Sequence, residues 1–269
     1  MVAAGLLLLL AFEIRLAAGE GGTTFTGGLK INADVEAVPA SFNAKAAVGV
    51  LGGGIWNELN PMSGTVTNWP NLVDAISGEP TGVSFACTAR DSFNANGHFG
   101  LALSAATDGL LGDYIYIGPG TITFTIAGLD PQSSYNLVVY CVGGSPGQAA
   151  IATGGVTGTT TASTASHFVL GNNYLQNEDA IPDASGVLKF RLQNTPRNNF
   201  VSFNGFQLQQ NPNLTIERAD DQHAVVKWRH GNLLEAAAPT GPWTPNVVGV
   251  SPYYIPTSSS VRYFQVQDP

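Results

Sequence analysis

Aromatic side chains placed beside amide side chains are the residues of this sequence best suited to chemistry. An aromatic ring can stack on the apolar C–H face of a sugar, and amide or guanidinium groups can bind sugar hydroxyls. Polar segments carry six candidate ligand-binding residues: Trp69, Asn71, Asn172, Tyr174, Arg197 and Asn199. The competing interpretation is core packing, because an aromatic residue in a loop is informative only when several are exposed together.

Acidic residues near predicted turns suggest a second kind of site, a structural calcium ion. Residues 91–97 place oxygen-bearing side chains at alternate positions before a glycine, as in half of a calcium loop. An EF-hand would need a glutamate where Leu103 stands, so that version fails. Asp91, Asp108 and Asp113 are candidate calcium ligands, and solvated turns are the alternative interpretation of the same residues.

Patterns that support catalysis are weak. Residues 143–147, GGSPG, fit the G-x-S-x-G motif of a hydrolase, but Pro146 lacks the N–H that an oxyanion hole needs and no helical segment follows. We therefore expect a hairpin loop there. The histidines have no metal-ligand spacing. The loop carboxylates that a glycosidase could use show no paired spacing, and these are Glu58, Glu79, Glu178 and Asp179.

The elements that must position these residues are predicted to be strands. Thr and apolar residues alternate over 121–126, and the alternation resumes from Tyr135 after a turn at 128–131. The spacing of this turn predicts a tyrosine corner, in which Tyr135 hydrogen-bonds to the preceding backbone. Residues 91–109 are expected to form a polar loop followed by a short apolar segment. The sequence predicts an all-β fold, a jelly-roll-like antiparallel β-sandwich over residues 20–211.

The pattern breaks at residues 210–213 and then restarts with short strands and many aromatic residues. We expect residues 212–269 to form a small C-terminal β module. About 55 residues is marginal for an independent core, so this module is expected to pack on the sandwich or to be rich in buried aromatic residues.

Composition limits the partners. The net charge is −8 with only 11 Lys and Arg, which do not cluster, so neither nucleic acid nor an anionic membrane surface is expected as a partner. The apolar run 6–12 followed by small residues resembles a secretory signal over residues 1–19, and a miscalled N-terminus is the alternative. We expect a secreted protein without a membrane span.

Two cysteines, Cys87 and Cys141, each end an apolar strand. In an exported protein they could form a disulfide, and buried thiols that act as small hydrophobic groups are the alternative. Both interpretations stay open, because the register of neighbouring strands cannot be read from the sequence.

Several segments resemble secreted β-sandwich modules of environmental bacteria, which are similar in architecture to galactose-binding-like and carbohydrate-binding modules. The resemblance is carried by WN at 56–57, LVD at 72–74, LLGDY at 110–114, GLDPQSSYNLVVY at 128–140 and FNGFQL at 203–208. The tail resembles a short C-terminal β module of such proteins, through VKW at 226–228, LLE at 233–235, GPW at 241–243, SPY at 251–253 and RYF at 262–264. By analogy the resemblance implies export and carbohydrate binding, but it transfers no ligand-contacting residue.

Three functions follow in order of preference. The first is non-catalytic recognition of carbohydrate or another neutral surface, with no cofactor beyond a structural calcium ion. The second is a surface or matrix protein that assembles with other chains by strand addition through the Thr/Ser/Gly-rich segment 154–166 and the small C-terminal module. The third is a polysaccharide hydrolase, which would need two carboxylates facing each other across a groove.

Overall fold

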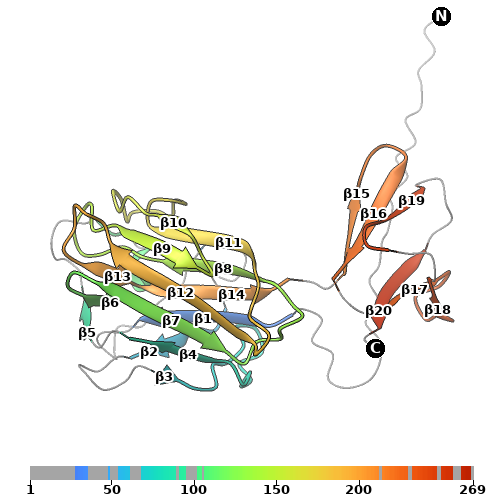
Figure 1. Ribbon diagram of the computed structural model, residues 1–269, viewed down its shortest axis with the longest axis horizontal. Coiled ribbons are helices and arrows are strands. Elements are labelled where there is room, and N and C mark those ends of the chain that lie inside the picture. Colours follow the sequence, from blue (N-terminus) through green and yellow to red (C-terminus); the bar gives the residue numbers. More distant parts are fainter. Residues whose placement is uncertain are drawn as a thin grey trace, which may run out of the picture. The chain divides into compact units, whose positions relative to one another are not determined.

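The computed structural model describes residues 28–35, 48, 54–60, 68–88, 91–94, 102–104, 106–211, 214–229, 232–246, 250–256 and 262–267. The expected signal peptide, residues 1–19, lies outside the described residues. The chain divides into two compact units, with the boundary between Asn211 and Pro212. Each unit is described by itself below, and both are drawn in Figure 1.

Five strands form the first sheet of the larger unit. In order across the sheet they are β11 (Tyr174–Ala180), β8 (Tyr135–Tyr140), β14 (Gly205–Gln210), β1 (Lys30–Val35) and β2 (Asn57–Leu59). All neighbours are antiparallel except β1 and β2, which are parallel. This parallel pair is the exception in an otherwise antiparallel sheet, and the long connection between β1 and β2 lets the chain return in the same direction.

Six strands form the second sheet, and each pair of neighbouring strands in it is antiparallel. Their order is β10 (Gly158–Thr159), β9 (Ala150–Gly154), β12 (Val187–Asn194), β7 (Thr121–Ala127), β4 (Ser84–Cys87) and β3 (Asn68–Trp69). The alternation seen in the sequence decides which face is buried. Ile122, Phe124 and Ile126 of β7 are fully buried, whereas its threonines point away from the core.

The two sheets share one apolar core. Phe85 of β4 lies 4.9 Å, centroid to centroid, from Phe206 of β14 in the other sheet, and Phe124 stacks on Phe190 at 4.7 Å. Among the described residues only α1 (Asp108–Leu111) is an α-helix. The all-β prediction is confirmed. None of the described helical segments is long and apolar enough to cross a membrane.

The predicted tyrosine corner is present between β7 and β8. The backbone N–H of Asp130 donates a hydrogen bond to the hydroxyl of Tyr135 over 2.9 Å. The turn needs a glycine at Gly128, which has a φ of 86° and on which a Cβ would come within 2.6 Å of the carbonyl oxygen of Gly82. The corner thus fixes the crossing from one sheet to the other.

The two cysteines lie in opposite sheets of this core. Cys87 ends β4, Cys141 follows β8, and the structure holds both as buried thiols that are not joined in a disulfide. Burial raises the pKa of the Cys141 thiol to about 12, against a hydrogen bond with the side chain of Thr160 that lowers it. In this state Cys141 behaves as a small hydrophobic core residue.

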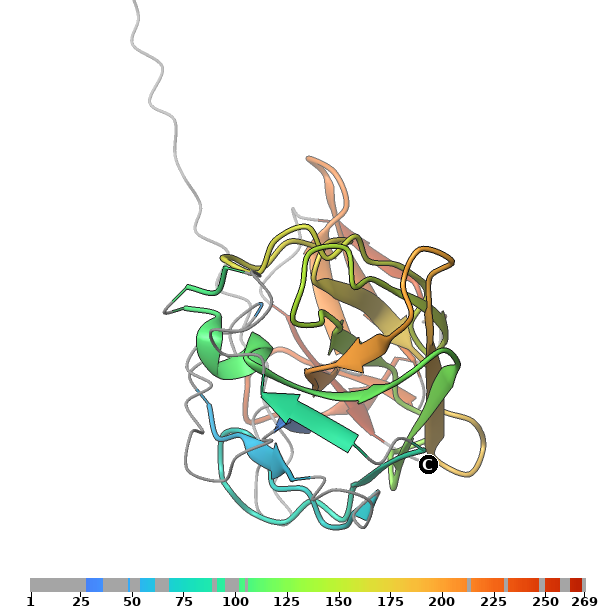
Figure 2. The ribbon, with the colours of Figure 1, turned by 90° about the vertical axis from the view of Figure 1, so that its left-hand side faces the viewer.

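A third, three-stranded sheet lies at one end of the larger unit, in the order β13 (Val201–Phe203), β6 (Asp113–Ile117) and β5 (Asp91–Asn94). Figure 2 looks onto this end of the unit. The expectation of a polar loop is wrong for residues 91–94, because pairing with β6 satisfies their backbone and makes them an edge strand. Only Asn204 separates β13 from β14, so this sheet is directly connected to the first.

The smaller unit contains two three-stranded antiparallel sheets. One is ordered β15 (Leu214–Arg218), β16 (His223–Trp228) and β19 (Tyr253–Pro256), and the other β18 (Thr244–Pro245), β17 (Asn232–Ala236) and β20 (Tyr263–Gln267). Its core contains Leu214, Val226, Leu233, Ile255 and Phe264, with Trp228 and Tyr253 packed against them. This is a small core of its own, containing several aromatic rings.

Candidate functional site

The strongest candidate site is a groove on one face of the β5–β6–β13 sheet, which we call the aromatic groove. It is lined by Phe93, Tyr114, Tyr116, Gln148, Phe200 and Ser202. Period-two alternation along β6 creates it. Ile115 points into the main core, so its neighbours Tyr114 and Tyr116 must point to the opposite face.

Strand register brings the other groove residues to the same face. Phe93 of β5 is the cross-strand partner of Tyr114, and Ser202 of β13 is the partner of Tyr116. Antiparallel partners point to the same side of a sheet. The residues on either side of Ser202, Val201 and Phe203, are fully buried in the main core, which leaves Ser202 facing the groove.

Four aromatic rings form a continuous cluster in the groove. Ring centroids lie 5.7 Å apart for Phe93 and Tyr114, 6.0 Å for Tyr114 and Tyr116, and 6.2 Å for Tyr116 and Phe200. The last two pairs are edge-on, a favourable arrangement for aromatic quadrupoles that holds the rings in place. Phe200 is 42% exposed, so it presents a ring surface to solvent at the groove.

Two polar side chains complete the lining. Ser202 is only 2% exposed, and its Oγ has no hydrogen-bond partner among the described residues. The Oε1 atom of Gln148 is likewise buried and without a partner in the described part of the chain. Buried polar atoms are nearly always hydrogen-bonded in folded proteins, so these two atoms are candidates for hydrogen bonds with water or a ligand.

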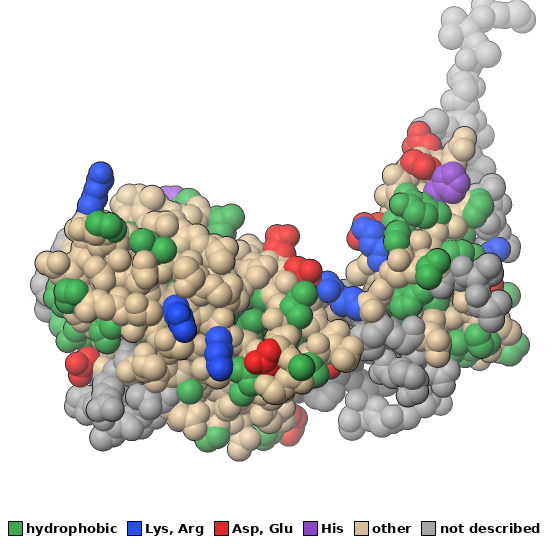
Figure 3. All heavy atoms as spheres, in the orientation of Figure 1, with side chains coloured by type: hydrophobic (Ala, Val, Ile, Leu, Met, Phe, Trp, Pro, Cys, Tyr) green, Lys and Arg blue, Asp and Glu red, His purple; other side chains and the backbone are tan. Residues whose placement is uncertain are grey.

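The groove is small and its described lining carries no charged residue. Its volume is about 330 Å³, near the lower end of the roughly 300–1,000 Å³ typical of small-molecule sites. One carboxylate lies at its edge, because Asp91 is the exposed cross-strand partner of Tyr116 and so points to the same face. Figure 3 shows few, scattered charges on the visible face of the larger unit.

The electrostatics of the groove keep Tyr114 neutral. Burial raises the pKa of its hydroxyl above the ordinary value of 10.0, a hydrogen bond with the backbone of Gly144 opposes this, and the nearby Tyr116 adds to the increase. The shift widens the pH range in which this phenol is protonated, and the described lining of the groove offers hydroxyl and amide groups without a charged side chain.

The aromatic residues singled out from the sequence lie elsewhere. Trp69 is in β3, an outermost strand of the six-stranded sheet, and its ring packs 5.7 Å from Phe85 of the core. Tyr174 is in β11, an outermost strand of the other sheet, and packs 5.9 Å from Tyr140. Neither lines the aromatic groove, and both make the core contacts that the alternative interpretation anticipated.

The polar residues predicted beside them have different environments. Asn71 is exposed in a turn with a φ of 54°. Asn172 holds a loop together, because its Oδ1 accepts hydrogen bonds from the backbone N–H groups of Ser163 and Thr164, and its Nδ2 donates to Ser163 Oγ. These contacts engage both ends of the Asn172 amide.

Arg197 and Asn199 are the predicted residues nearest in sequence to the groove. Both are exposed in the turn that leads into Phe200 and β13. Between them, Asn198 shapes this turn by donating hydrogen bonds to the carbonyl oxygens of Ala149 and Phe200, over 3.3 and 2.7 Å. The sequence analysis thus identified this turn but missed the ring of Phe200.

The candidate calcium ligands do not come together. Asp91 pairs with Tyr116, whereas Asp113 pairs with Asn94, so the strand register puts the two aspartates on opposite faces of the sheet. Asp108 lies in α1. No group of three or more His, Cys, Asp or Glu residues that could hold a metal ion occurs within the described ranges.

The motifs considered for catalysis are also dispersed. Residues 143–147 form turns and are followed by β9, not by a helix, so the prediction of a loop is confirmed. The expected hairpin is wrong, because the strands on either side, β8 and β9, lie in different sheets. Of the loop carboxylates, Glu58 is in β2, Glu79 in an exposed turn, and Glu178 and Asp179 at the exposed end of β11. None of them lines the aromatic groove.

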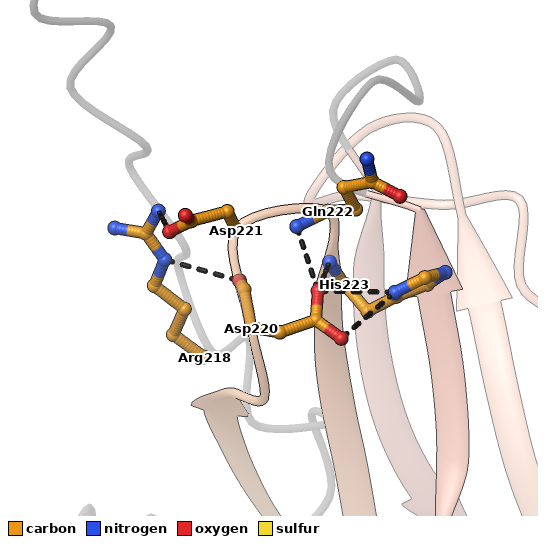
Figure 4. A network of polar contacts seen from close by, with 5 residues as sticks. All are labelled: Arg218, Asp220, Asp221, Gln222 and His223. Carbon is orange, nitrogen blue, oxygen red and sulfur yellow. Dashed lines mark hydrogen bonds and ion pairs between the residues drawn. The ribbon is translucent and has the colours of Figure 1, made fainter.

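The smaller unit carries one cluster of charged side chains, at the turn between β15 and β16 (Figure 4). Asp220 accepts hydrogen bonds from the backbone N–H groups of Gln222 and His223, both over 2.7 Å, and its carboxylate lies 3.1 Å from His223 Nδ1. The backbone bond from Gln222, then the side-chain and backbone contacts of His223, hold the pKa of Asp220 below its ordinary value against a small opposing effect of burial. Arg218 bridges to Asp221 over 2.7 Å. The cluster is exposed and closes a hairpin.

Comparisons with known proteins add no assignment. A scan against family models finds none that matches this chain, and neither the curated proteins nor the solved structures yield a match. The site's chemistry must therefore be argued from its own residues.

Two signals in the sequence could have identified the groove. The segment DYIYI, residues 113–117, alternates tyrosine with isoleucine, so one face of the strand is aromatic and the other aliphatic. The segment FVSF, residues 200–203, places a serine between two core positions. What neither signal contains is the pairing of β6 with β13 on one side and with residues 91–94 on the other.

Proposed function

We propose that this protein binds neutral carbohydrate in the aromatic groove and does not cleave it. The observation that carries the proposal is the combination of four clustered rings with two buried polar atoms that have no partner in the described chain. Rings offer faces and edges for the C–H surface of a sugar, and the polar atoms offer hydrogen bonds to its hydroxyls.

The absence of charge from the described lining favours a neutral ligand. An acidic sugar would have to leave its carboxylate in an apolar groove without a cationic partner, which is costly. Asp91, at the edge, is suited to accept hydrogen bonds from two neighbouring hydroxyls, because an ionised carboxylate offers two acceptor oxygens.

The size of the groove favours a short ligand. At about 330 Å³ it suits one or two sugar rings, such as a chain end or a side branch. We propose the same groove as the site of surface recognition if that sugar belongs to an extracellular polymer. Secretion, as expected from residues 1–19, would bring the protein to such a polymer.

Assembly through strand edges, the alternative function, would use another part of the molecule. Segment 154–166 contains β10, an outermost strand. Farther along this segment, the backbone of Ala162 is already hydrogen-bonded within the unit. The carbonyl oxygen of Ala162 accepts from Gly147, and its N–H donates to Asn172. Carbohydrate binding has the more specific support, because the groove offers polar groups that a ligand would satisfy.

A glycan array with the full chain tests the proposal, comparing the wild type with Tyr116→Ala/Phe200→Ala and with Tyr174→Ala. We expect sugar binding to be lost in the double variant and retained in Tyr174→Ala. Loss in Tyr174→Ala alone would move the site to β11. A folded wild-type protein that binds no glycan would contradict the proposed function.

A further inference from the structure

We infer that Ser202 is a specificity-determining residue that binds one sugar hydroxyl and makes the groove reject analogues lacking that hydroxyl. The inference rests on the proposed function and deepens it, because it names the group on the ligand that is recognised. It is carried by the burial of Ser202, by its orientation and by the missing partner of its Oγ among the described residues.

The orientation of Ser202 follows from the strand. Its neighbours Val201 and Phe203 are fully buried in the core and leave no alternative register, since a slip by one residue would bury Ser202 among aromatic rings. Pairing with Tyr116 then places the hydroxyl next to the rings that would hold the sugar. Ser202 therefore lies on the groove face of the sheet, beside Tyr116, and its buried hydroxyl contacts a sugar once the neighbouring rings shift to admit it.

An apolar residue would serve the fold better at this position. A buried hydroxyl that gives up its hydrogen bonds to water without replacing them lowers the stability of the folded state. Valine or alanine would avoid that cost on an otherwise aromatic face. A serine placed here indicates that the hydroxyl is used when a ligand is bound.

Gln148 further restricts the range of ligands that the groove can bind. Its Oε1 is an acceptor only, so it needs a donor from the ligand. The same Oε1 lies against the backbone of Gly143, where it is the atom nearest to an added Cβ, so the side chain must turn before Oε1 can accept from a ligand. A ligand that satisfies both residues must bring hydroxyl donors into the groove.

This requirement separates a sugar from a proline-rich peptide, the other ligand that aromatic grooves commonly take. Proline residues bring carbonyl acceptors but no backbone N–H donors, so they leave Gln148 Oε1 unsatisfied. A sugar ring brings several hydroxyls, each of which can donate and accept. The groove therefore favours the sugar.

The test uses the full chain and methyl glycosides of glucose, galactose, mannose and xylose, with their monodeoxy analogues and a decaproline peptide. For the glycoside that binds, we expect Ser202→Ala to weaken binding about tenfold or more by calorimetry, which corresponds to about 1.4 kcal/mol. One monodeoxy analogue should bind the wild type about as much more weakly than its parent glycoside does. On Ser202→Ala the same analogue and its parent should bind almost equally, which is the coupling that a double-mutant cycle measures.

Thermal unfolding without ligand supplies a second readout. Ser202→Ala should unfold at the same temperature as the wild type or higher. The matched control is Ser134→Ala, which removes a buried hydroxyl that accepts a hydrogen bond from Asn211 Nδ2 over 2.8 Å and should unfold at a lower temperature.

The outcomes separate the two proposals. If no glycoside binds the wild type, or if decaproline binds in the groove instead, the proposed function and this inference both fail. If a glycoside binds and depends on Phe200 but not on Ser202, the function stands and the inference is wrong. A lowered unfolding temperature in Ser202→Ala, with unchanged preference among deoxy sugars, would show a purely structural serine.

Discussion

Phe93 faces Tyr114 across the β5–β6 pairing, with the two ring centroids 5.7 Å apart. This contact attaches a four-residue edge strand to the end of the larger unit and adds the Phe93 ring to the groove face of Tyr114. One pairing therefore both extends the sheet and completes the aromatic lining. The groove depends on β5 as much as on the tyrosines of β6.

Phe200 is expected to provide a binding surface with little effect on stability. Truncation to alanine should weaken glycan binding about tenfold or more, because it removes an exposed ring from the groove, whereas Phe200→Trp should retain binding through a larger face. Calorimetry or a pulldown measures this. Ile181→Ala, at another exposed apolar residue, is the control. Equal affinity of Phe200→Ala and the wild type would contradict the prediction.

Asp74 is expected to stabilise the larger unit and to make it sensitive to acid. Its carboxylate accepts hydrogen bonds from the backbone N–H groups of Lys30, Ile76 and Ser77, over 3.0, 3.0 and 2.9 Å. Burial raises the pKa of Asp74, but these bonds outweigh it and hold the pKa below its ordinary value of 3.8. Asp74→Asn should lower the free energy of unfolding by about 1–3 kcal/mol at neutral pH, because an Nδ2 group cannot accept.

The sign of the pH dependence follows from the lowered pKa. The contribution of Asp74 is present above the ordinary pKa and is lost as the pH falls through the lower pKa of the folded state. Urea denaturation at a series of pH values from neutral to acid should show that the free energy of unfolding falls more steeply for the wild type than for Asp74→Asn. Parallel curves would mean that other carboxylates control the acid response.

Cys141 is expected to make the fold sensitive to alkali. Its folded pKa of about 12 exceeds the ordinary 9.0, so its contribution is present below pH 9.0 and is lost as the pH rises towards 12. Between these two pKa values, one such thiol lowers the free energy of unfolding by about 1.4 kcal/mol per pH unit. Cys141→Ala should be less stable than the wild type at neutral pH, but its free energy of unfolding should fall less steeply above pH 9.0. Denaturant titration measures both. An unchanged slope would contradict the assignment to this thiol.

The tyrosine corner is expected to contribute through its hydroxyl. Tyr135→Phe leaves the N–H of Asp130 without the acceptor that now lies 2.9 Å away, so the free energy of unfolding should fall by about 1–2 kcal/mol. Chemical denaturation compares it with Tyr174→Phe, which keeps the corner intact. A loss of the same size in both variants would mean that the corner bond itself contributes nothing.

The sequence predicted local features well. The alternation of β7 and β8, the turn at Gly128 and the bond of Tyr135 all depend on residues close together in the chain, and the structure confirms them. The loop at residues 143–147 was predicted on the same basis. Parallel pairing of β1 with β2 was not, because it depends on a contact between segments more distant in sequence.

The candidate site, in contrast, depends on residues that are far apart in the sequence. Trp69 and Tyr174 were selected because amides flank them in sequence, yet both rings pack against other rings of the unit. Asp91 and Asp113 were selected for their oxygen atoms, yet the register between β5 and β6 places them on opposite faces. Neighbours along the chain are poor guides to neighbours across a sheet, where adjacent residues point in opposite directions.

By itself the sequence determined an all-β chain, the strands that alternate and the core residues within them, because burial of every second residue is a local pattern. It also determined that Tyr114 and Tyr116 share a face. Only the tertiary structure decided that this face meets Phe93, Phe200 and Ser202 in one groove. With the tyrosines of β6, these residues come from three segments, 91–94, 113–117 and 200–203, and the strand register that unites them is fixed when β6 and β13 pack their other faces into the core.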